Sequence, residues 1–246
     1  MSVDGICITM PVYNEAEGIV DFLNEIDSAF AKTKCKIIVI NDNSNDLTLE
    51  LLSEVKNMGA ELSIVSNSKN IGHGPSTLKG LNLACSENIT YIMSTDGDGQ
   101  ITGKDLFMIY SKLLNNEADI VEGIRINRKE PLHRFLISKI TTLLVFLASR
   151  KWPKDANTPI RCYKKNSLEL ILKKIDKSNP IPNMFISEVS RNEEFRILES
   201  DVSWGHRKGK NSIGSSWSKK NKIFPSVNLI IFCSKSIKYW FMNING

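Results

Sequence analysis

The sequence lacks the cysteine patterns of disulfide-rich and zinc-binding proteins. Its five cysteines are scattered, odd in number and never spaced as C-x-x-C. This argues against a disulfide framework and a zinc site, and it favours reduced, mostly buried thiols in a cytosolic protein. The first residues contain no charged segment followed by an apolar core, so no signal peptide is expected.

Two nucleotide-binding motifs and a long apolar run are also missing. The chain contains no GxxxxGK[ST], and no GxGxxG follows its first apolar segment, so a nucleotidyltransferase or another nucleotide-binding enzyme on a similar sheet lacks support. The apolar segments 135–149 and 223–242 are interrupted by lysines, and the second also by Pro225. Both fall short of a membrane-spanning helix, which needs about 20 apolar residues. We interpret both as amphipathic or interfacial helices, with simple packing against the core as the alternative.

Acidic residues are absent from the last part of the chain. Residues 202–246 contain eight Lys/Arg and no Asp/Glu, whereas residues 1–201 carry 24 basic and 27 acidic groups. A second basic stretch, residues 125–165, has eleven Lys/Arg against two acids. Such clusters point to phosphates of a nucleotide, lipid head group or nucleic acid, or else to a solvated basic face. No nucleic-acid-binding module is recognisable, so we expect no nucleic-acid partner.

The length and pattern of the chain predict an α/β fold. The 246 residues are 41% hydrophobic, enough for one sizeable core in one large domain or a domain with an appendage. Short apolar runs alternate with helical patterns, which is typical of a mostly parallel sheet flanked by helices. We expect strands at 5–10, 36–40, 62–65, 91–94 and near 120. Pro11 is expected to end the first strand. We expect a helix that begins after Asn14, with Asn14 as its cap and Glu17 completing a capping box. Further helices are expected at 47–58, from about 75 to 85, and at 103–115.

Four polar loops follow these predicted strands. They are Tyr13–Glu15, Asp42–Asp46, Asn70–Gly74 and Asp96–Gln100. In open α/β sheets, ligands bind outside the carboxyl ends of the strands. The loops therefore predict a binding site at one edge of the sheet.

Asp96 and Asp98 are the strongest candidates for chemistry. Two carboxylates one residue apart after a buried strand can hold one Mg²⁺ or Mn²⁺ ion, which bridges a diphosphate. The two glycines of the same loop allow a tight turn, and a plain turn is the alternative reading. Asp42 is a candidate acceptor for a nucleobase, or a helix cap. The glycines at 72 and 74 can let a nucleotide approach the backbone.

Together these motifs resemble a known family. The segments Pro11–Glu15, Ile40–Asp46, Asn70–Gly74 and Asp96–Gln100 occur in the order and spacing of family 2 glycosyltransferases. The resemblance is closer to the branch related to dolichol-phosphate mannose synthase and polyprenyl-phosphate sugar transferases. It continues through Gly123–Arg125, Asp155–Arg161 and His206–Ile213, and covers roughly residues 5–215. One departure is Asn41, where an aspartate is usual before Asp42.

The resemblance implies an A-type glycosyltransferase fold with a mostly parallel, Rossmann-like sheet, a nucleotide-diphosphate-sugar donor, and Mg²⁺ or Mn²⁺. It assigns the metal and diphosphate to Asp96 and Asp98, the sugar to Gln100, and a phosphate-neutralising role to Arg207. The nucleoside would be surrounded by Pro11, Tyr13, Glu15, Asp42 and Gly72. The acceptor side would contain Arg125, Asp155, Arg161 and Ser212.

The resemblance further implies a single displacement with inversion. The acceptor would be a polyprenyl phosphate or a lipid-linked glycan, in cell-surface glycan synthesis. A polyprenyl phosphate is already ionised near neutral pH, so it requires no general base, whereas a sugar hydroxyl requires one. Glu188 is the candidate base for that case; alternatively, it is an exposed carboxylate on a helix.

The expected organisation is a catalytic domain at 1–215 and a basic amphipathic tail at 216–246. Within the domain, 1–124 would bind the nucleotide sugar and 125–215 the acceptor. We expect a cytoplasmic protein, peripheral on the inner face of a membrane. Two other functions stay open: transfer to a free glycan hydroxyl, and a non-catalytic nucleotide-sugar-binding scaffold. The Asp96 and Asp98 pair argues against the scaffold.

Overall fold

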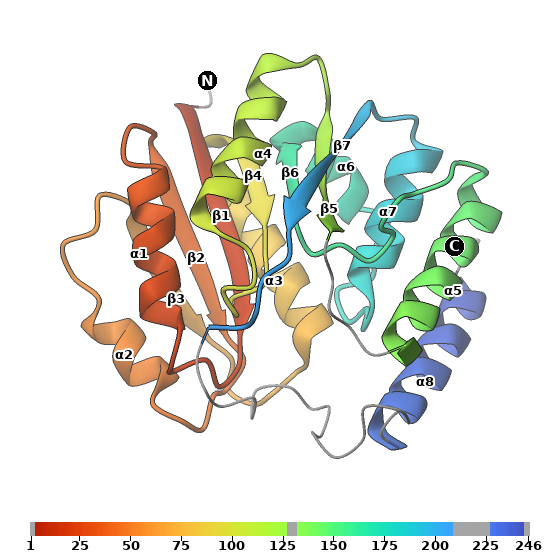
Figure 1. Ribbon diagram of the computed structural model, residues 1–246, viewed down its shortest axis with the longest axis horizontal. Helices are drawn as coiled ribbons and strands as arrows, with labels where there is room; N and C mark the ends of the chain where they lie inside the picture. The colour runs from red at the N-terminus through yellow and green to blue at the C-terminus, as the bar shows by residue number, and fades with distance from the viewer. Residues whose placement is uncertain (1–2, 127–131, 209–226, 244–246) are drawn as a thin grey trace.

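The computed structural model describes residues 3–126, 132–208 and 227–243. A single seven-stranded sheet with the order β3-β2-β1-β4-β6-β5-β7 forms the centre of the molecule (Figure 1). Parallel pairing joins β1 to both β2 and β4, β2 to β3, and β5 to β7, whereas β6 is antiparallel to both neighbours. The predicted α/β class, with a mostly parallel sheet, is confirmed.

The strands alternate with helices in the expected order. The strands are β1 (Val3–Val12), β2 (Cys35–Asn41), β3 (Glu61–Ser66), β4 (Ile89–Ser94), β5 (Ile120–Ile126), β6 (Arg161–Lys164) and β7 (Ile197–Ser203). The helices are α1 (Ile19–Ala29), α2 (Thr48–Glu54), α3 (His73–Ser86), α4 (Gly103–Asn115), α5 (Leu132–Ser149), α6 (Lys165–Leu172), α7 (Pro182–Asn192) and α8 (Val227–Asn243). The helix α2 is shorter than the expected 47–58, because Val55 already has an extended backbone.

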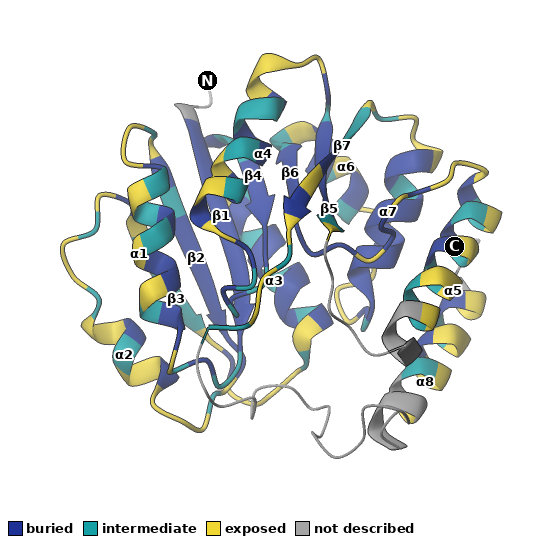
Figure 2. Ribbon diagram, in the orientation of Figure 1, coloured by how far each residue is buried: buried dark blue, intermediate teal, exposed yellow. Residues whose placement is uncertain are grey.

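Each face of the sheet has its own core. Ile6, Ile8 and Met10 of β1 pack with α1 and α4, while Cys7 and the alternate residues of β2 pack with α3, α6 and α7. The edge strands β3 and β7 are partly exposed, but because both faces of the sheet are covered, the strands β1, β2, β4 and β5 are buried along most of their length (Figure 2). This explains why they appear in the sequence as continuous apolar runs.

Two further helices, α5 and α8, lie beyond α7 at one side of the molecule (Figure 1). Val145 of α5 and Trp240 of α8 belong to the core cluster that contains α7. Trp240 is fully buried, and its ring lies 4.7 Å from that of Phe185 on α7. Both predicted helices are therefore present and pack on the core through one face. Within the described residues, no helix is long and apolar enough to cross a membrane.

The first strand continues past Pro11, so the prediction that Pro11 ends it is wrong. Pro11 pairs with Ile40 of β2, whereas the pairing of β1 with β4 stops at Thr9 and Ser94. The missing N–H of Pro11 lies on the side where β4 has already ended. Proline therefore removes no ladder hydrogen bond at this position.

Asn14 does not cap the first helix, so the predicted capping box with Glu17 is also wrong. The helix α1 begins at Ile19, after Gly18, and no side chain caps it. Asn14 has a positive φ of 56°, and its Oδ1 accepts a hydrogen bond from the N–H of Asn45 at 3.0 Å. The side chain joins two loops instead of starting a helix.

Candidate active site

The loops after β1 and β2 are tied together by hydrogen bonds. The N–H of Asn14 donates to Ser44 Oγ at 3.0 Å, and the N–H of Glu15 donates to Thr48 Oγ1 at 2.8 Å. Asn41 accepts a hydrogen bond from the N–H of Ser44 through its Oδ1 at 3.1 Å. Asn41, which replaces the usual aspartate, therefore supports the loop that carries Asp42.

Asp42 joins this pair of loops to the third one. Its carboxylate accepts hydrogen bonds from the N–H groups of Ile71 and Gly72, both at 2.9 Å, and from Asn67 Nδ2 at 2.8 Å. Asp42 is 3% exposed. A carboxylate has about four acceptor positions, and Asp42 uses two of them to hold the 70–72 loop and a third to bind Asn67. The nucleobase contact of Asp42 stays a prediction.

The other residues predicted around the nucleoside lie at the same edge. Pro11 is buried in the last part of β1, Tyr13 is half-buried just after it, and Glu15 is 9% exposed. Gly72 directly precedes α3, and its N–H is bound to Asp42. The structure thus brings these five residues to the carboxyl ends of three adjacent strands, β1, β2 and β3.

The fourth loop, which contains Asp96 and Asp98, lies close to the end of β1. A Cβ atom on Gly97 would lie 2.3 Å from Cγ1 of Val12, so only glycine fits there. His73, the first residue of α3, places Nε2 2.8 Å from Asp96 Oδ1. The carboxylate of Asp96 is thereby oriented by a side chain from the third loop.

Several acidic groups share this edge. Burial raises the pKa of Asp98 to about 6, with a further rise from Asp96 that Arg207 opposes. For Asp96, burial acts upward, but His73 and nearby arginines outweigh it and hold its pKa below the usual range. Burial also raises the pKa of Glu15 to about 8, against the effect of Arg207. Carboxylates gathered in this way attract a cation.

A segment far along the chain, residues 204–208, crosses the Asp96–Gln100 loop. The N–H of Gly205 donates to the Gln100 carbonyl at 2.8 Å, and Gln100 Nε2 donates back to the Gly205 carbonyl at 3.0 Å. The N–H of Lys208 donates to the carbonyl of Asp98 at 3.0 Å, and its Nζ pairs with Glu25 at 2.6 Å. Gln100, predicted near the sugar, therefore also positions this segment.

Arg207 is the cation that this segment brings to the carboxylates. Its Nη2 lies 2.5 Å from Glu15 Oε1, across 192 positions of sequence, and its Nε lies 3.6 Å from Asp98 Oδ2. The Nε atom is buried and makes no hydrogen bond within the described part of the chain. The guanidinium therefore keeps an unused donor beside Asp98.

Arg125 approaches the same site from the end of β5. Its Nε and Nη2 donate to the two carboxylate oxygens of Asp155 at 2.7 and 2.9 Å, and Nη2 also donates to the carbonyl of Asn157 at 3.1 Å. The guanidinium carbon lies 5.1 Å from the centre of the Trp204 ring. Its charge helps to lower the pKa of Asp96. Arg125 and Asp155 thus form one rigid unit next to the carboxylates.

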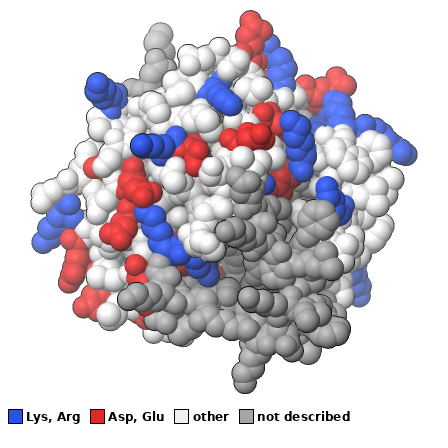
Figure 3. Space-filling view, viewed as in Figure 1, with Lys and Arg blue, Asp and Glu red and all other residues white. Residues whose placement is uncertain are grey.

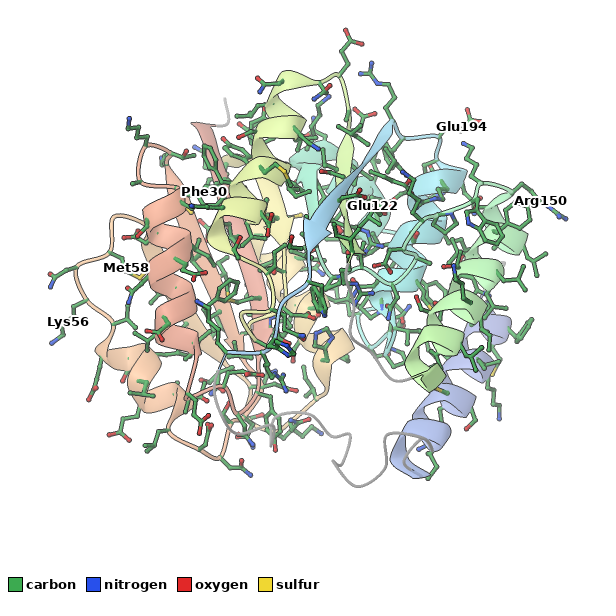
Figure 4. All side chains as sticks on the ribbon, in the orientation of Figure 1. Phe30, Lys56, Met58, Glu122, Arg150 and Glu194 are labelled. Carbon is green, nitrogen blue, oxygen red and sulfur yellow. The ribbon has the colours of Figure 1, made fainter. Side chains whose placement is uncertain are left out.

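Arg161, predicted on the acceptor side, has no exposed surface. Its Nε donates to Glu122 Oε1 at 2.8 Å, and its other nitrogens donate to Asn183 and to backbone carbonyls. Glu122, also 0% exposed, pairs in addition with Arg191 at 2.8 Å. Figure 4 shows Glu122 inside the molecule, whereas Arg150 projects at its edge. Arg161 therefore connects elements inside the molecule and has no surface available to an acceptor.

Sequence reasoning missed Glu122, Arg191 and Trp204. A signal existed for Glu122, because a glutamate inside the apolar run 120–124 needs a buried partner. No comparable signal marks Trp204, since only the fold brings β7 beside β5. The contact partners of these three residues are determined by the tertiary structure.

Glu188 lies on α7 and is 5% exposed, so the alternative of an exposed carboxylate is wrong. Its Oε2 is buried and, among the described residues, has no hydrogen-bond partner. Burial raises the pKa of Glu188 to about 7. Its predicted role as a general base stays a prediction.

Among its described residues, the basic stretch 125–165 does not form one positive surface. Arg125, Arg161 and Lys164 are each paired with a carboxylate. On the face seen in Figure 3, basic and acidic side chains alternate over the described residues. Ser212 and residues 216–226 and 244–246 of the basic tail lie outside the described residues. In the part that the structure describes, no group of three or more His, Cys, Asp or Glu is arranged to hold a metal ion.

Sequence comparison identifies relatives of known and unknown activity. The chain is 32% identical over 149 residues to an uncharacterised protein of Methanocaldococcus jannaschii, covering 58% of this chain and 63% of that protein. It is 23% identical over 209 residues to the undecaprenyl-phosphate 4-deoxy-4-formamido-L-arabinose transferase of Klebsiella pneumoniae, covering 84% of this chain and 63% of that enzyme. The chain thus spans about 63% of the length of these relatives.

Solved structures show the same fold at low identity. The glucosyl-3-phosphoglycerate synthase of Mycobacterium tuberculosis superposes with a TM-score of 0.63 at 12% identity, covering 98% of this chain and 78% of that one. The S. aureus TarS fragment 1–349 superposes with a TM-score of 0.59 at 16% identity, covering 82% of this chain and 60% of that one. The predicted A-type glycosyltransferase fold is confirmed.

The family is identified by a match over the first two thirds of the chain. Residues 7–171 match the model of the family described as glycosyl transferase family 2. This region contains all four polar loops and the Asp96 and Asp98 pair. The resemblance predicted from those motifs is confirmed, and the chain belongs to glycosyl transferase family 2.

Proposed function

We propose that this protein transfers a sugar from a nucleotide-diphosphate sugar to a polyprenyl phosphate, with inversion. One observation carries the proposal: Arg207 lies between Glu15 and Asp98, beside the Asp96 carboxylate. An arginine next to clustered carboxylates suits a leaving diphosphate, whose charge the arginine and a metal ion would share. The K. pneumoniae relative, named as an undecaprenyl-phosphate sugar transferase, supports this acceptor class.

In this proposal the donor binds at the carboxyl ends of β1 and β2. Pro11, Tyr13, Glu15, Asp42 and Gly72 would surround the nucleoside. The fold neighbour from M. tuberculosis was crystallised with Mn²⁺ and uridine diphosphate, which supports a nucleotide donor for this fold. Residues 1–124 would then be the donor half and 125–215 the acceptor half.

Asp96 and Asp98 would hold a divalent cation, Mg²⁺ or Mn²⁺. The raised pKa of Asp98, due to burial and to the neighbouring Asp96, supports this assignment, because a bound cation relieves that repulsion. Such a cation neutralises charge on the departing diphosphate. Gln100, fixed by Gly205, would lie near the sugar.

The reaction would be one displacement at the anomeric carbon. A phosphate oxygen of the acceptor attacks from the side opposite the diphosphate, the bond to the diphosphate breaks, and Arg207 stabilises the departing oxygen. Arg125 would bind the acceptor phosphate through Nη1, which makes no hydrogen bond to any described residue. Asp155 orients Arg125, and Arg161 supports the same region from inside.

Transfer to a sugar hydroxyl is a second candidate, favoured by Glu188. A buried carboxylate with a pKa of about 7 is suited to accept a proton near neutral pH. Under this alternative, Glu188→Gln strongly reduces turnover with a glycan acceptor. Transfer to polyprenyl phosphate should be unaffected by the same change.

The decisive experiment measures nucleotide release and sugar transfer with purified protein. It uses UDP-, GDP- and dTDP-sugars, Mn²⁺ or EDTA, and polyprenyl phosphate present or absent. We expect metal-dependent release that rises with the lipid and falls at least about 100-fold in Asp98→Asn. Asp201→Asn, at an exposed position on β7, is the control and should retain activity. Donor binding without any turnover would instead favour the scaffold function.

We also propose peripheral attachment to the cytoplasmic face of a membrane through α5 and α8. Along α5, four large apolar side chains at a spacing of four, three and four residues are 46–52% exposed: Leu136, Ile140, Leu143 and Leu147. Neither helix contains an acidic residue, and Lys139, Lys235 and Lys238 are exposed. An apolar stripe flanked by lysines fits the surface of an anionic bilayer.

A further inference from the structure

We infer that Trp204 is a positioning residue that holds Arg125 in the orientation needed to bind the acceptor phosphate. The inference rests on the proposed function, because it assigns how one acceptor contact is set. Trp204 follows directly after β7, and its N–H donates to the carbonyl of Ile126, the last residue of β5, at 3.3 Å. The two strands that carry Trp204 and Arg125 therefore keep a fixed register at this point.

Three neighbours restrain the Arg125 side chain, two through its Nε and Nη2 atoms and one through an aromatic ring. Asp155 accepts from Nε and Nη2, and the carbonyl of Asn157 accepts from Nη2. The guanidinium carbon lies over the Trp204 ring, 5.1 Å from the ring centre. An arginine whose Nε and Nη2 atoms are already bonded retains Nη1, with its two N–H groups, for an anion.

The ring also places this arginine relative to the rest of the site. Immediately after Trp204, Gly205 exchanges two hydrogen bonds with Gln100, and two residues later Arg207 reaches Asp98. Trp204 thus fixes the distance between the cation for the acceptor and the cation for the leaving group. Inverting displacement requires the two phosphates on opposite sides of the sugar, so this spacing affects acceptor binding directly.

Aromatic contact with a guanidinium is strong enough to matter here. A partly desolvated cation–π contact contributes a factor of about 3–30 in an equilibrium constant. The side chain of Arg125 is only 10% exposed, which weakens competition from water. Trp204 is partly buried and also packs against the core cluster of α1 and α4, so a test must separate positioning from stability.

The test measures binding of farnesyl phosphate by calorimetry, which requires no donor and no turnover. We expect Trp204→Leu to raise the dissociation constant about tenfold. Trp204→Phe keeps an aromatic face, so its dissociation constant should stay within about threefold of that of the parent protein. Trp152→Leu is the matched control, because Trp152 is 57% exposed and packs on Phe146 instead of an arginine. Thermal unfolding of each variant monitors stability.

A double-mutant comparison isolates the pathway through Arg125. In the Arg125→Met background, Trp204→Leu should change the dissociation constant less than about twofold, because no guanidinium remains to be held. Equal losses in both backgrounds, or unchanged binding in Trp204→Leu, would overturn the inference and leave the proposed function intact. If the parent protein itself binds no farnesyl phosphate, the proposed acceptor falls, and the inference falls with it.

Discussion

Charged groups are held in opposite ways in the two halves of the sheet. In the N-terminal half, residues 3–119, the carboxylates of Glu15, Asp96 and Asp98 gather at the carboxyl edge, with Arg207 as a cation supplied from outside that half. In the C-terminal half, the described residues from 120 onward, Glu122 and Arg161 neutralise each other at 0% exposure inside the molecule. The first arrangement leaves negative charge for a ligand to compensate, whereas the second uses charge to connect strands.

Apolar surface shows the same contrast. Exposed apolar side chains of the N-terminal half lie on separate elements, such as Leu47 before α2 and Leu114 on α4, whereas four on α5 form one line. Scattered exposed apolar residues are normal on a protein surface, while a continuous line marks a contact surface. Figure 2 shows exposed residues along α5 at one side of the molecule. Under the proposed function, the first half would bind small charged ligands and the second would contact a larger apolar surface.

Breaking the buried ion pairs should have the largest effect. We expect Glu122→Gln to lower the free energy of unfolding by about 3–5 kcal/mol, because Arg161 and Arg191 would lose their buried counter-charge. Equilibrium unfolding in urea measures this. Glu193→Gln, which removes a partly exposed partner of Lys174, is the control and should cost at most about 1 kcal/mol. Equal losses of unfolding free energy in both variants would show that the internal ion pairs matter no more for stability than the surface pair.

An effect of intermediate size is expected in the pH dependence of stability, through a buried carboxyl group of the C-terminal half. Glu188 has a pKa of about 7 in the folded protein, well above its value of about 4.3 in an unfolded chain. The folded state therefore binds more protons between these values, and stability falls as pH rises through that window and levels off above pH 7.

Replacing the Glu188 carboxyl group should remove this loss of stability with rising pH. We expect the stability of Glu188→Gln relative to the parent protein to increase by about 2–3 kcal/mol between pH 5 and pH 8. Urea unfolding at several pH values measures the difference. Glu194→Gln, whose side chain is 84% exposed, should show no such trend. A constant difference across this range would mean that Glu188 does not titrate there.

The smallest expected effect concerns the apolar line on α5. Changing both Leu143 and Leu147 to Asn should weaken binding to anionic vesicles about tenfold, since each half-exposed side chain contributes part of its transfer free energy. Sedimentation with vesicles at low salt measures this. Leu114→Asn on α4 is the matched control, because Leu114 is 47% exposed and Leu143 46%. Similar binding by all variants would refute attachment through α5.

Much of the site could be predicted because the signals are local. Polar loops after apolar strands imply convergence at one sheet edge, and the structure places Asp42, Asp96 and the Tyr13–Glu15 loop there. The errors came from neighbours that the sequence does not show. Pro11 stays in β1 because β4 ends earlier, and Asn14 bonds to the loop after β2 instead of capping a helix.

The sequence by itself determined the α/β alternation, the mostly parallel sheet and the carboxylate pair Asp96 and Asp98, because these depend on residue spacing within single elements. The tertiary structure alone decided which charges meet. It placed Arg207 against Glu15 across 192 positions, buried Arg161 against Glu122, and set Trp204 over Arg125. Such pairings depend on the approach of distant segments, which no local pattern specifies.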